Sequence, residues 1–240
     1  FKKIYLMEQY KEPYKYDLAS FPFIIDIEST NICNLNCIMC DRRIMSRKLG
    51  YMDLNLYKKM VDEASKEGLL GIRFIRFGEP LLHPKIFEMV KYAKEKNILT
   101  HITTNGFLLT DDKMNKIFNS GLDSIIFSFQ GTNKEEYQKI RNNKGYDKLV
   151  SIIKNFVSLR NRLNIKKPYI QVNTSILDET QEQIESFVEY WKKIVDDVNC
   201  TTTTLIRIQH LDNIKPLLPR QRILKNKERC NEVRTKLSID

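Results

Sequence analysis

Short apolar runs alternate with longer amphipathic stretches along most of the chain. The apolar runs are dense in β-branched and aromatic residues, which predicts strands over residues 23–28, 70–77, 98–103, 122–129, 168–177 and 202–209. Between them, apolar residues recur at helical spacing, which predicts helices over residues 53–68, 84–96, 111–119, 146–163 and 179–191. Strands that alternate with helices are typical of an α/β fold with a parallel sheet and covering helices.

The two ends of the chain break this alternation. Residues 1–21 are rich in Tyr and Lys and are interpreted as an N-terminal arm. Residues 22–212 contain all of the predicted strands and helices and form the main domain. Pro216 and Pro219 punctuate a linker, so residues 213–240 are interpreted as a linker and the beginning of a C-terminal extension.

The first strand is followed by a long loop that contains three closely spaced cysteines. Cys33, Cys37 and Cys40 have the spacing C-x3-C-x2-C, whereas Cys200 and Cys230 lie far away. Each iron of a four-iron cluster takes one cysteine sulfur, so three thiolates can hold three irons and leave the fourth open to another ligand. A loop of this length within a compact domain is usually functional.

A structural zinc site is the alternative for these cysteines, with a His or a distant Cys as the fourth ligand. Zinc motifs usually contain two closely spaced cysteine pairs, and the sequence has no second pair. The nearest histidine, His83, is more than forty residues away and is expected to be structural. The spacing favours an iron–sulfur cluster and leaves zinc open.

Composition and charge narrow the possible cellular locations and binding partners of the chain. The chain has 42% apolar residues but no apolar run long enough for a membrane span, and its start does not look like a signal peptide. A cytoplasmic location, where thiolates stay reduced, is therefore expected. The net charge of +10 fits an anionic substrate, nucleic acid or an acidic reductase. Because no block of five like charges occurs, nucleic acid is not expected as a partner.

The segment at residues 25–40, IDIESTNICNLNCIMC, resembles the cluster loop of the radical S-adenosylmethionine (SAM) enzymes. Met39 stands where that family usually has an aromatic residue. The resemblance implies a [4Fe–4S] cluster, held by the three cysteines, whose open iron chelates the amino and carboxylate groups of SAM. It also implies reductive cleavage of SAM to methionine and a 5′-deoxyadenosyl radical. Met39 is included among the expected cofactor-binding residues.

Short motifs at the ends of the next two predicted strands extend the resemblance. Gly78 and Glu79 resemble the family's Gly-Gly-Glu element, with Phe77 in place of the first glycine. That element contacts the amino group of SAM, which needs a carboxylate or backbone carbonyls as acceptors. Asn105 lies in a Thr-Asn-Gly turn after the third strand, where the family places an Asn near the SAM pocket.

Ser128 and Arg141 resemble the family's Ser and Arg after the fourth strand, which hydrogen-bond the ribose and carboxylate of SAM. Gln130 departs from the pattern, since most members have an acidic residue there. On the fifth strand, Asn173 shares one face with two other polar residues. That face is interpreted either as part of a polar cavity, which would make Asn173 a cofactor-binding residue, or as a solvent face.

The family implies an open (β/α)6 partial TIM barrel with parallel strands, and six units are indeed too few for a closed eight-unit barrel. Active sites of such barrels gather at the carboxyl ends of the strands, where these motifs lie. Cys230 and residues 237–240 resemble the first residues of a SPASM or twitch auxiliary domain. This likeness suggests an auxiliary iron–sulfur cluster beyond residue 240.

The predicted function is hydrogen abstraction from a peptide or protein, or from a sugar or aminoglycoside. An electron donor such as flavodoxin or ferredoxin is the expected partner. One alternative is an enzyme that modifies RNA or tRNA bases, and another is a non-catalytic iron–sulfur or zinc protein. The substrate-side catalytic residue cannot be identified from the sequence.

Overall fold

The computed structural model describes residues 21–176, 179–202 and 236–239. The N-terminal arm lies outside the described residues, except for residue 21. Residues 203–209 of the predicted sixth strand and the segment around Cys230 also lie outside them.

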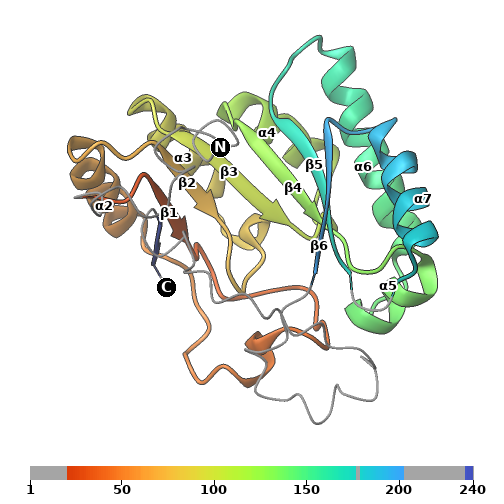
Figure 1. Cartoon of the computed structure of the whole chain (residues 1–240). Helices are drawn as coiled ribbons and strands as arrows, with labels where there is room; N and C mark the ends of the chain where they lie inside the picture. The colour runs from red at the N-terminus through yellow and green to blue at the C-terminus, as the bar shows by residue number, and fades with distance from the viewer. Residues whose placement is uncertain (1–20, 177–178, 203–235, 240) are drawn as a thin grey trace, which may run out of the picture.

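Seven parallel strands form one sheet in the order β6-β5-β4-β3-β2-β1-β7 (Figure 1). The strands are β1 (Ile24–Ile27), β2 (Gly71–Phe74), β3 (Leu99–Thr104), β4 (Ser124–Ser128), β5 (Tyr169–Ile176), β6 (Asp197–Thr202) and β7 (Lys236–Ile239). The sheet is open, because β6 and β7 lie at opposite edges. The predicted partial barrel is therefore confirmed, with β7 from the predicted extension added beside β1.

From β1 to β6, each connection between consecutive strands contains a helix as the sequence predicts, with end points that differ by a few residues. One further helix, α5, lies where the sequence analysis predicts none. No helix among residues 21–176 and 179–202 is both long and apolar enough to span a membrane. The α-helices are α2 (Leu54–Lys66), α3 (Ile86–Glu95), α4 (Asp111–Ser120), α5 (Lys134–Arg141), α6 (Tyr146–Arg162) and α7 (Gln181–Lys192). Two short 3-10 helices are η2 (Asp41–Ile44) and η3 (Pro80–Leu82).

The sixth strand begins five residues earlier than predicted, and the rest of its predicted range lies outside the described residues. The sequence favours residues 202–209, whereas β6 covers Asp197–Thr202. Its register with β5 runs from Gln171 opposite Asp197 to Ile176 opposite Thr202. Asp and Asn have low intrinsic strand preference, so this segment looks like a loop in isolation. Pairing with β5 outweighs that local preference.

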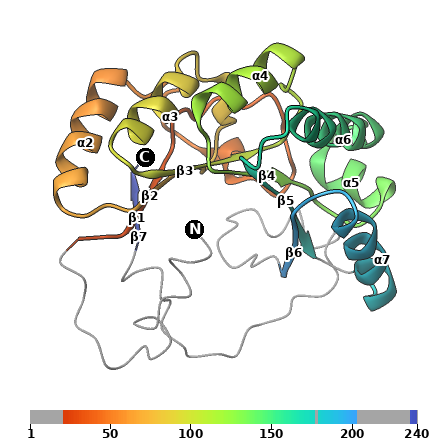
Figure 2. The same cartoon turned by 90° about the horizontal axis from the view of Figure 1, so that it is seen from above.

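The two faces of the sheet differ in polarity. Helices α2, α3, α4 and α6 all lie on one side of the curved sheet (Figure 2). The strand residues of the main core include Ile72, Ile102, Ile125 and Val172, each fully buried. Alternate residues of a strand point to opposite faces, so the polar residues between them face the inside of the open barrel. The apolar face thus holds the fold together and leaves the inner face for polar chemistry.

A row of polar residues crosses the inner face in register. Asp26 lies opposite Arg73, Arg73 opposite His101, and His101 opposite Ser124. Arg73 donates from Nε to Asp26 Oδ1 at 2.6 Å, and His101 Nδ1 lies 2.7 Å from Ser124 Oγ. Burial lowers the pKa of His101 to about 3, so its imidazole is neutral at physiological pH. The Asp26 carboxylate forms an ion pair with Arg73 within the sheet.

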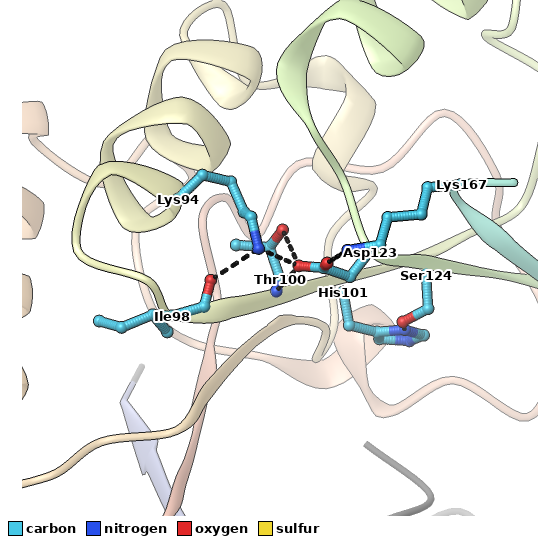
Figure 3. A network of polar contacts seen from close by, with 7 residues as sticks. All are labelled: Lys94, Ile98, Thr100, His101, Asp123, Ser124 and Lys167. Carbon is cyan, nitrogen blue, oxygen red and sulfur yellow. Dashed lines mark hydrogen bonds and ion pairs between the residues drawn. The ribbon is translucent and has the colours of Figure 1, made fainter. Parts of the chain in front are cut away.

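A buried carboxylate fastens the amino-terminal end of the barrel (Figure 3). Asp123, directly before β4, accepts hydrogen bonds from Lys94 Nζ at 2.6 Å, Lys167 Nζ at 2.6 Å and the Thr100 backbone N–H at 2.9 Å. Burial alone raises the pKa of Asp123, but these hydrogen bonds outweigh it and hold the pKa below its usual value. One side chain thereby joins α3, β3, β4 and the segment before β5.

The substitution Asp123→Asn is expected to lower the free energy of unfolding at pH 7 by about 2 kcal/mol, because buried donors lose a charged acceptor. The matched variant Asp112→Asn removes an exposed i,i+4 pair with Lys116 and should cost at most about 0.5 kcal/mol. Urea unfolding measures both.

The pH dependence gives a second check on Asp123. Its pKa is lower in the folded state, so its contribution is complete above the unfolded pKa of about 4 and is lost as the pH falls through the folded value. The difference between wild type and Asp123→Asn should shrink at acidic pH. A difference that grows on acidification would contradict this assignment.

Candidate cofactor site at the carboxyl ends of the strands

The cysteine loop between β1 and α2 is closed by hydrogen bonds at its base. Thr30 and Tyr51 form an antiparallel bridge, and Thr30 Oγ1 donates to the Gly50 carbonyl at 2.7 Å. Asn31 Oδ1 accepts from the Gly50 N–H at 2.8 Å, while Asn31 Nδ2 donates to the Lys48 carbonyl at 2.9 Å. Two segments nearly twenty residues apart are thus joined. In Figure 1 the closed loop lies below the arrowheads of the central strands.

The three cysteines face one cavity of about 190 Å³. Cys37 is buried, and Cys33 and Cys40 are partly buried. Burial raises the pKa of both Cys33 and Cys40, so each favours its protonated thiol in the metal-free protein. Binding to iron requires the thiolate, and metal binding at this site must therefore release protons.

The arrangement fits separate irons better than one zinc ion. Within the part of the chain that the structure describes, no three His, Cys, Asp or Glu side chains converge closely enough to hold one metal ion. Ligands of a cluster need not converge, because each binds a different iron. His83 is engaged elsewhere: its Nε2 faces the Met52 carbonyl at 3.0 Å, and its Nδ1 accepts from the Lys85 N–H at 3.1 Å. Its expected structural role agrees with these contacts.

Gly78 lies where the cysteine loop crosses the turn after β2. A Cβ atom at Gly78 would lie 1.7 Å from the Thr30 carbonyl oxygen, so no other residue fits without a backbone shift. The next residue ties the two segments together, since the Glu79 N–H donates to the Ile32 carbonyl at 2.9 Å. Glycine at this position is therefore a packing requirement of the site.

The carboxylate of Glu79 is 2% exposed and joins two strand ends. It accepts from the Thr104 hydroxyl at 2.7 Å, the Asn105 N–H at 2.8 Å and the Leu81 N–H at 3.2 Å. Burial raises the pKa of Glu79, and these three donors oppose the rise. The side chain thus has a structural task beyond the predicted contact with SAM.

Asn105 connects the turn after β3 to the cysteine loop. Its Nδ2 donates to Asn34 Oδ1 at 2.8 Å and lies 3.9 Å from Cys33 Sγ. Gly106 has a φ of +83°, and a Cβ there would lie 2.6 Å from a Leu149 methyl carbon. The Thr-Asn-Gly turn is therefore tight, as predicted, and it places the Asn105 amide beside the first cysteine.

Arg141 pairs with Ser128 and also reaches the second cysteine. Its Nη2 donates to Ser128 Oγ at 2.9 Å and to the Ser128 carbonyl, and its Nη1 lies 3.5 Å from Cys37 Sγ. The Ile38 N–H donates to the Ile140 carbonyl at 3.0 Å, which ties α5 to the cysteine loop. Arg141 Nε is buried and has no hydrogen-bond partner among the described residues. A buried N–H group of this kind can donate a hydrogen bond to an anionic ligand.

Nine of the ten predicted metal-binding and cofactor-binding residues line this cavity. The nine are Cys33, Cys37, Met39, Cys40, Gly78, Glu79, Asn105, Ser128 and Arg141. Asn173 is not among the lining residues: it lies opposite Ser128 on β5, and its Oδ1 is buried without a hydrogen-bond partner in the described part of the chain. Its contact with a cofactor stays a prediction.

Sequence reasoning missed two features of the cavity wall. Arg76 lines the cavity with a φ of +120°, a conformation rare for residues other than glycine, and nothing in an Arg-Phe-Gly sequence signals it. Thr104 also lines the cavity and donates to Glu79. Arg42 and Arg43 also line the wall beside the cysteines.

Comparison with known protein families identifies relatives of this chain. The model of the Radical SAM superfamily matches residues 27–190. The tungsten-containing aldehyde ferredoxin oxidoreductase cofactor-modifying protein of Pyrococcus furiosus is 29% identical over 196 residues, 81% of this chain and 52% of that protein. The PqqA peptide cyclase of Gluconobacter oxydans is 30% identical over 129 residues, 53% of this chain and 36% of that protein. The chain thus spans about half or less of these relatives.

Among solved structures, SuiB of Streptococcus suis bound to the precursor peptide SuiA has a TM-score of 0.65. The match covers 78% of this chain and 40% of SuiB at 18% identity, which establishes a likeness of fold alone.

The substitution Gly78→Ala is expected to displace the cysteine loop, because its Cβ meets the Thr30 carbonyl. We expect a loss of about 1–3 kcal/mol in the free energy of unfolding. The iron content of the variant after anaerobic reconstitution should also fall, because the displaced loop carries the cysteines. Gly50→Ala is the matched control, since a Cβ there meets no atom within 4 Å. Equal iron content in the two variants would refute the close crossing.

Proposed function

The chain belongs to the radical SAM superfamily, and on that premise we propose that it abstracts a hydrogen atom from a peptide substrate. The observation that carries the proposal is the cavity itself. It brings three cysteines from one loop together with polar groups from the ends of β2, β3 and β4. Separate segments of the chain converge there as the chemistry of this superfamily requires.

The residues present fit the family's cofactors. A [4Fe–4S] cluster with SAM supplies, once an electron arrives, a 5′-deoxyadenosyl radical that can take hydrogen from an unactivated carbon. The thiolates of Cys33, Cys37 and Cys40 would hold three irons, and the described part of the cavity wall contains no further cysteine for the fourth. The chain's own task is to bind, orient and shield these groups.

Arg141 is the proposed ligand of the SAM carboxylate. Arg141 is 6% exposed, its guanidinium donates to Ser128, and its Nε–H has no partner among the described residues. A guanidinium suits a carboxylate because its donors form a planar fork. The ammonium of SAM would instead meet the backbone carbonyls around Gly78, because the Glu79 carboxylate already accepts three hydrogen bonds.

An acidic electron carrier, such as flavodoxin or ferredoxin, is the proposed donor. Arg42 and Arg43 line the cavity beside Cys40, and Arg43 is exposed. The chain as a whole has a net charge of +10. Complementary charge accelerates the encounter of such partners and orients them.

Two observations support a peptide substrate. The PqqA cyclase is named for a peptide, and SuiB was crystallised with one. The inner face of the sheet is also polar, with Gln171, Asn173 and Ser175 alternating along β5, so it offers partners for a peptide backbone. The hydroxyls of a sugar or aminoglycoside could use the same partners, which makes that class the second candidate.

Anaerobically reconstituted protein with SAM and dithionite should form 5′-deoxyadenosine, detected by chromatography and mass spectrometry. Cys37→Ala should lose both the cluster absorbance and the product, because one of three iron ligands is gone. Cys200→Ala is the matched control, since Cys200 lies on β6 and outside the cavity lining. Stoichiometric zinc without cluster absorbance, or full product from Cys37→Ala, would contradict the proposal.

The same assay separates the substrate classes. Offered a deuterated peptide digest, the wild type should form 5′-deoxyadenosine that is one mass unit heavier, because the abstracted atom comes from the peptide. Label that appears only with deuterated sugars would favour the second candidate.

A further inference from the structure

Glu28 follows β1 directly and carries a buried carboxylate, with a side chain that is 3% exposed. A carboxylate in such a place is unfavourable unless its oxygens have partners. Oε1 lies 2.8 Å from Arg47 Nη2, and Oε2 accepts from the Phe77 N–H at 3.3 Å. Arg47 belongs to the cysteine loop and Phe77 to the turn after β2, so this carboxylate joins two segments that border the cavity.

The carboxylate takes the place of a backbone acceptor at the point where the pairing of β1 with β2 ends. The Ile75 N–H donates to the Ile27 carbonyl at 3.1 Å, one step beyond the last strand pair. The next carbonyl on that side of the chain is that of Ser29, and it accepts from the Met52 N–H at 2.8 Å. The Phe77 N–H is bound by the carboxylate instead.

The turn that receives this contact has an unusual backbone conformation. Arg76, directly before Phe77, has a φ of +120°, which a residue other than glycine keeps only when its surroundings enforce it. Beyond Phe77, the Glu79 N–H donates to the Ile32 carbonyl at 2.9 Å. The turn is therefore fixed from both sides, by the carboxylate at Phe77 and by the cysteine loop at Glu79, with Gly78 between them.

We propose that Glu28 is a positioning residue for SAM, because it fixes the turn at residues 76–79 whose carbonyls would receive the ammonium group. The inference rests on the proposed function, which assigns the ammonium to the carbonyls around Gly78. An ammonium group gains most from carbonyl oxygens that are fixed before it binds, since binding then has no ordering cost to offset. Glu28 is not among the described residues that line the cavity, so it acts through the turn.

A purely structural role for Glu28 makes a different prediction, namely lower stability with unchanged affinity for SAM. Glu28→Met removes both oxygens at similar length, whereas Glu28→Gln keeps an amide oxygen that can accept from the Phe77 N–H. The matched control is Asp196→Leu. Asp196 also pairs with an arginine, Arg160, and accepts from a backbone N–H, that of Ile170 at 2.7 Å, but it lies directly before β6 and outside the cavity lining.

The experiment measures the dissociation constant of SAM by equilibrium dialysis of the anaerobically reconstituted full chain, expressed per loaded cluster. Glu28→Met should raise this constant about tenfold, as expected for one lost acceptor in a buried site. Glu28→Gln and Asp196→Leu should match the wild type. A backbone ester at position 77, introduced with phenyllactic acid, removes only the Phe77 N–H and should also weaken SAM binding. The ester keeps the test decisive if Glu28→Met fails to load iron.

The outcomes distinguish this inference from the proposed function. Wild-type affinity in either Glu28→Met or the position-77 ester overturns the inference alone, as does a loss in Glu28→Gln or Asp196→Leu equal to that in Glu28→Met. A wild type that binds SAM but forms no 5′-deoxyadenosine overturns the proposed function, and the affinities still test Glu28. A wild type that binds no SAM overturns both.

Discussion

The buried carboxylate of Glu79 is the contact on which the site most depends. The backbone N–H of Glu79 donates to the Ile32 carbonyl in the cysteine loop, and the Glu79 side chain accepts from Thr104 and Asn105 at the end of β3. Burial of a carboxylate is unfavourable unless its oxygens are hydrogen-bonded, and here three donors surround it. Three chain segments are therefore fixed relative to one another, and Asn105 extends the contact to Asn34 beside the first cysteine.

The two ends of the open barrel have different roles. At the amino-terminal end, Asp123 joins α3, β3 and the segment before β5 through charged hydrogen bonds. At the carboxyl end, buried polar groups and the glycine turns surround the cavity. The apolar core between the sheet and the helices stabilises the domain as a whole. Polar side chains can therefore occupy the inner face of the sheet without weakening the main core.

Much of the fold follows from hydrophobic pattern alone, because each strand has a buried apolar face and each helix one apolar stripe. The cysteine spacing and the strand-end motifs likewise anticipate the cavity, since parallel strands bring their carboxyl ends to one edge. The start of the sixth strand did not follow, because Asp197 and Asn199 form a strand only through pairing with β5. The positive φ of Arg76 has no signal in the local sequence.

The proposed function requires a cluster with three cysteine ligands and one iron left for SAM. Mössbauer spectroscopy of protein reconstituted with ⁵⁷Fe, recorded before and after addition of SAM, detects such an iron. One iron of the four should change its isomer shift and quadrupole splitting on addition of SAM, while the other three stay unchanged. Four irons that are all unaffected by SAM, or the absence of a four-iron cluster, would contradict the proposed function.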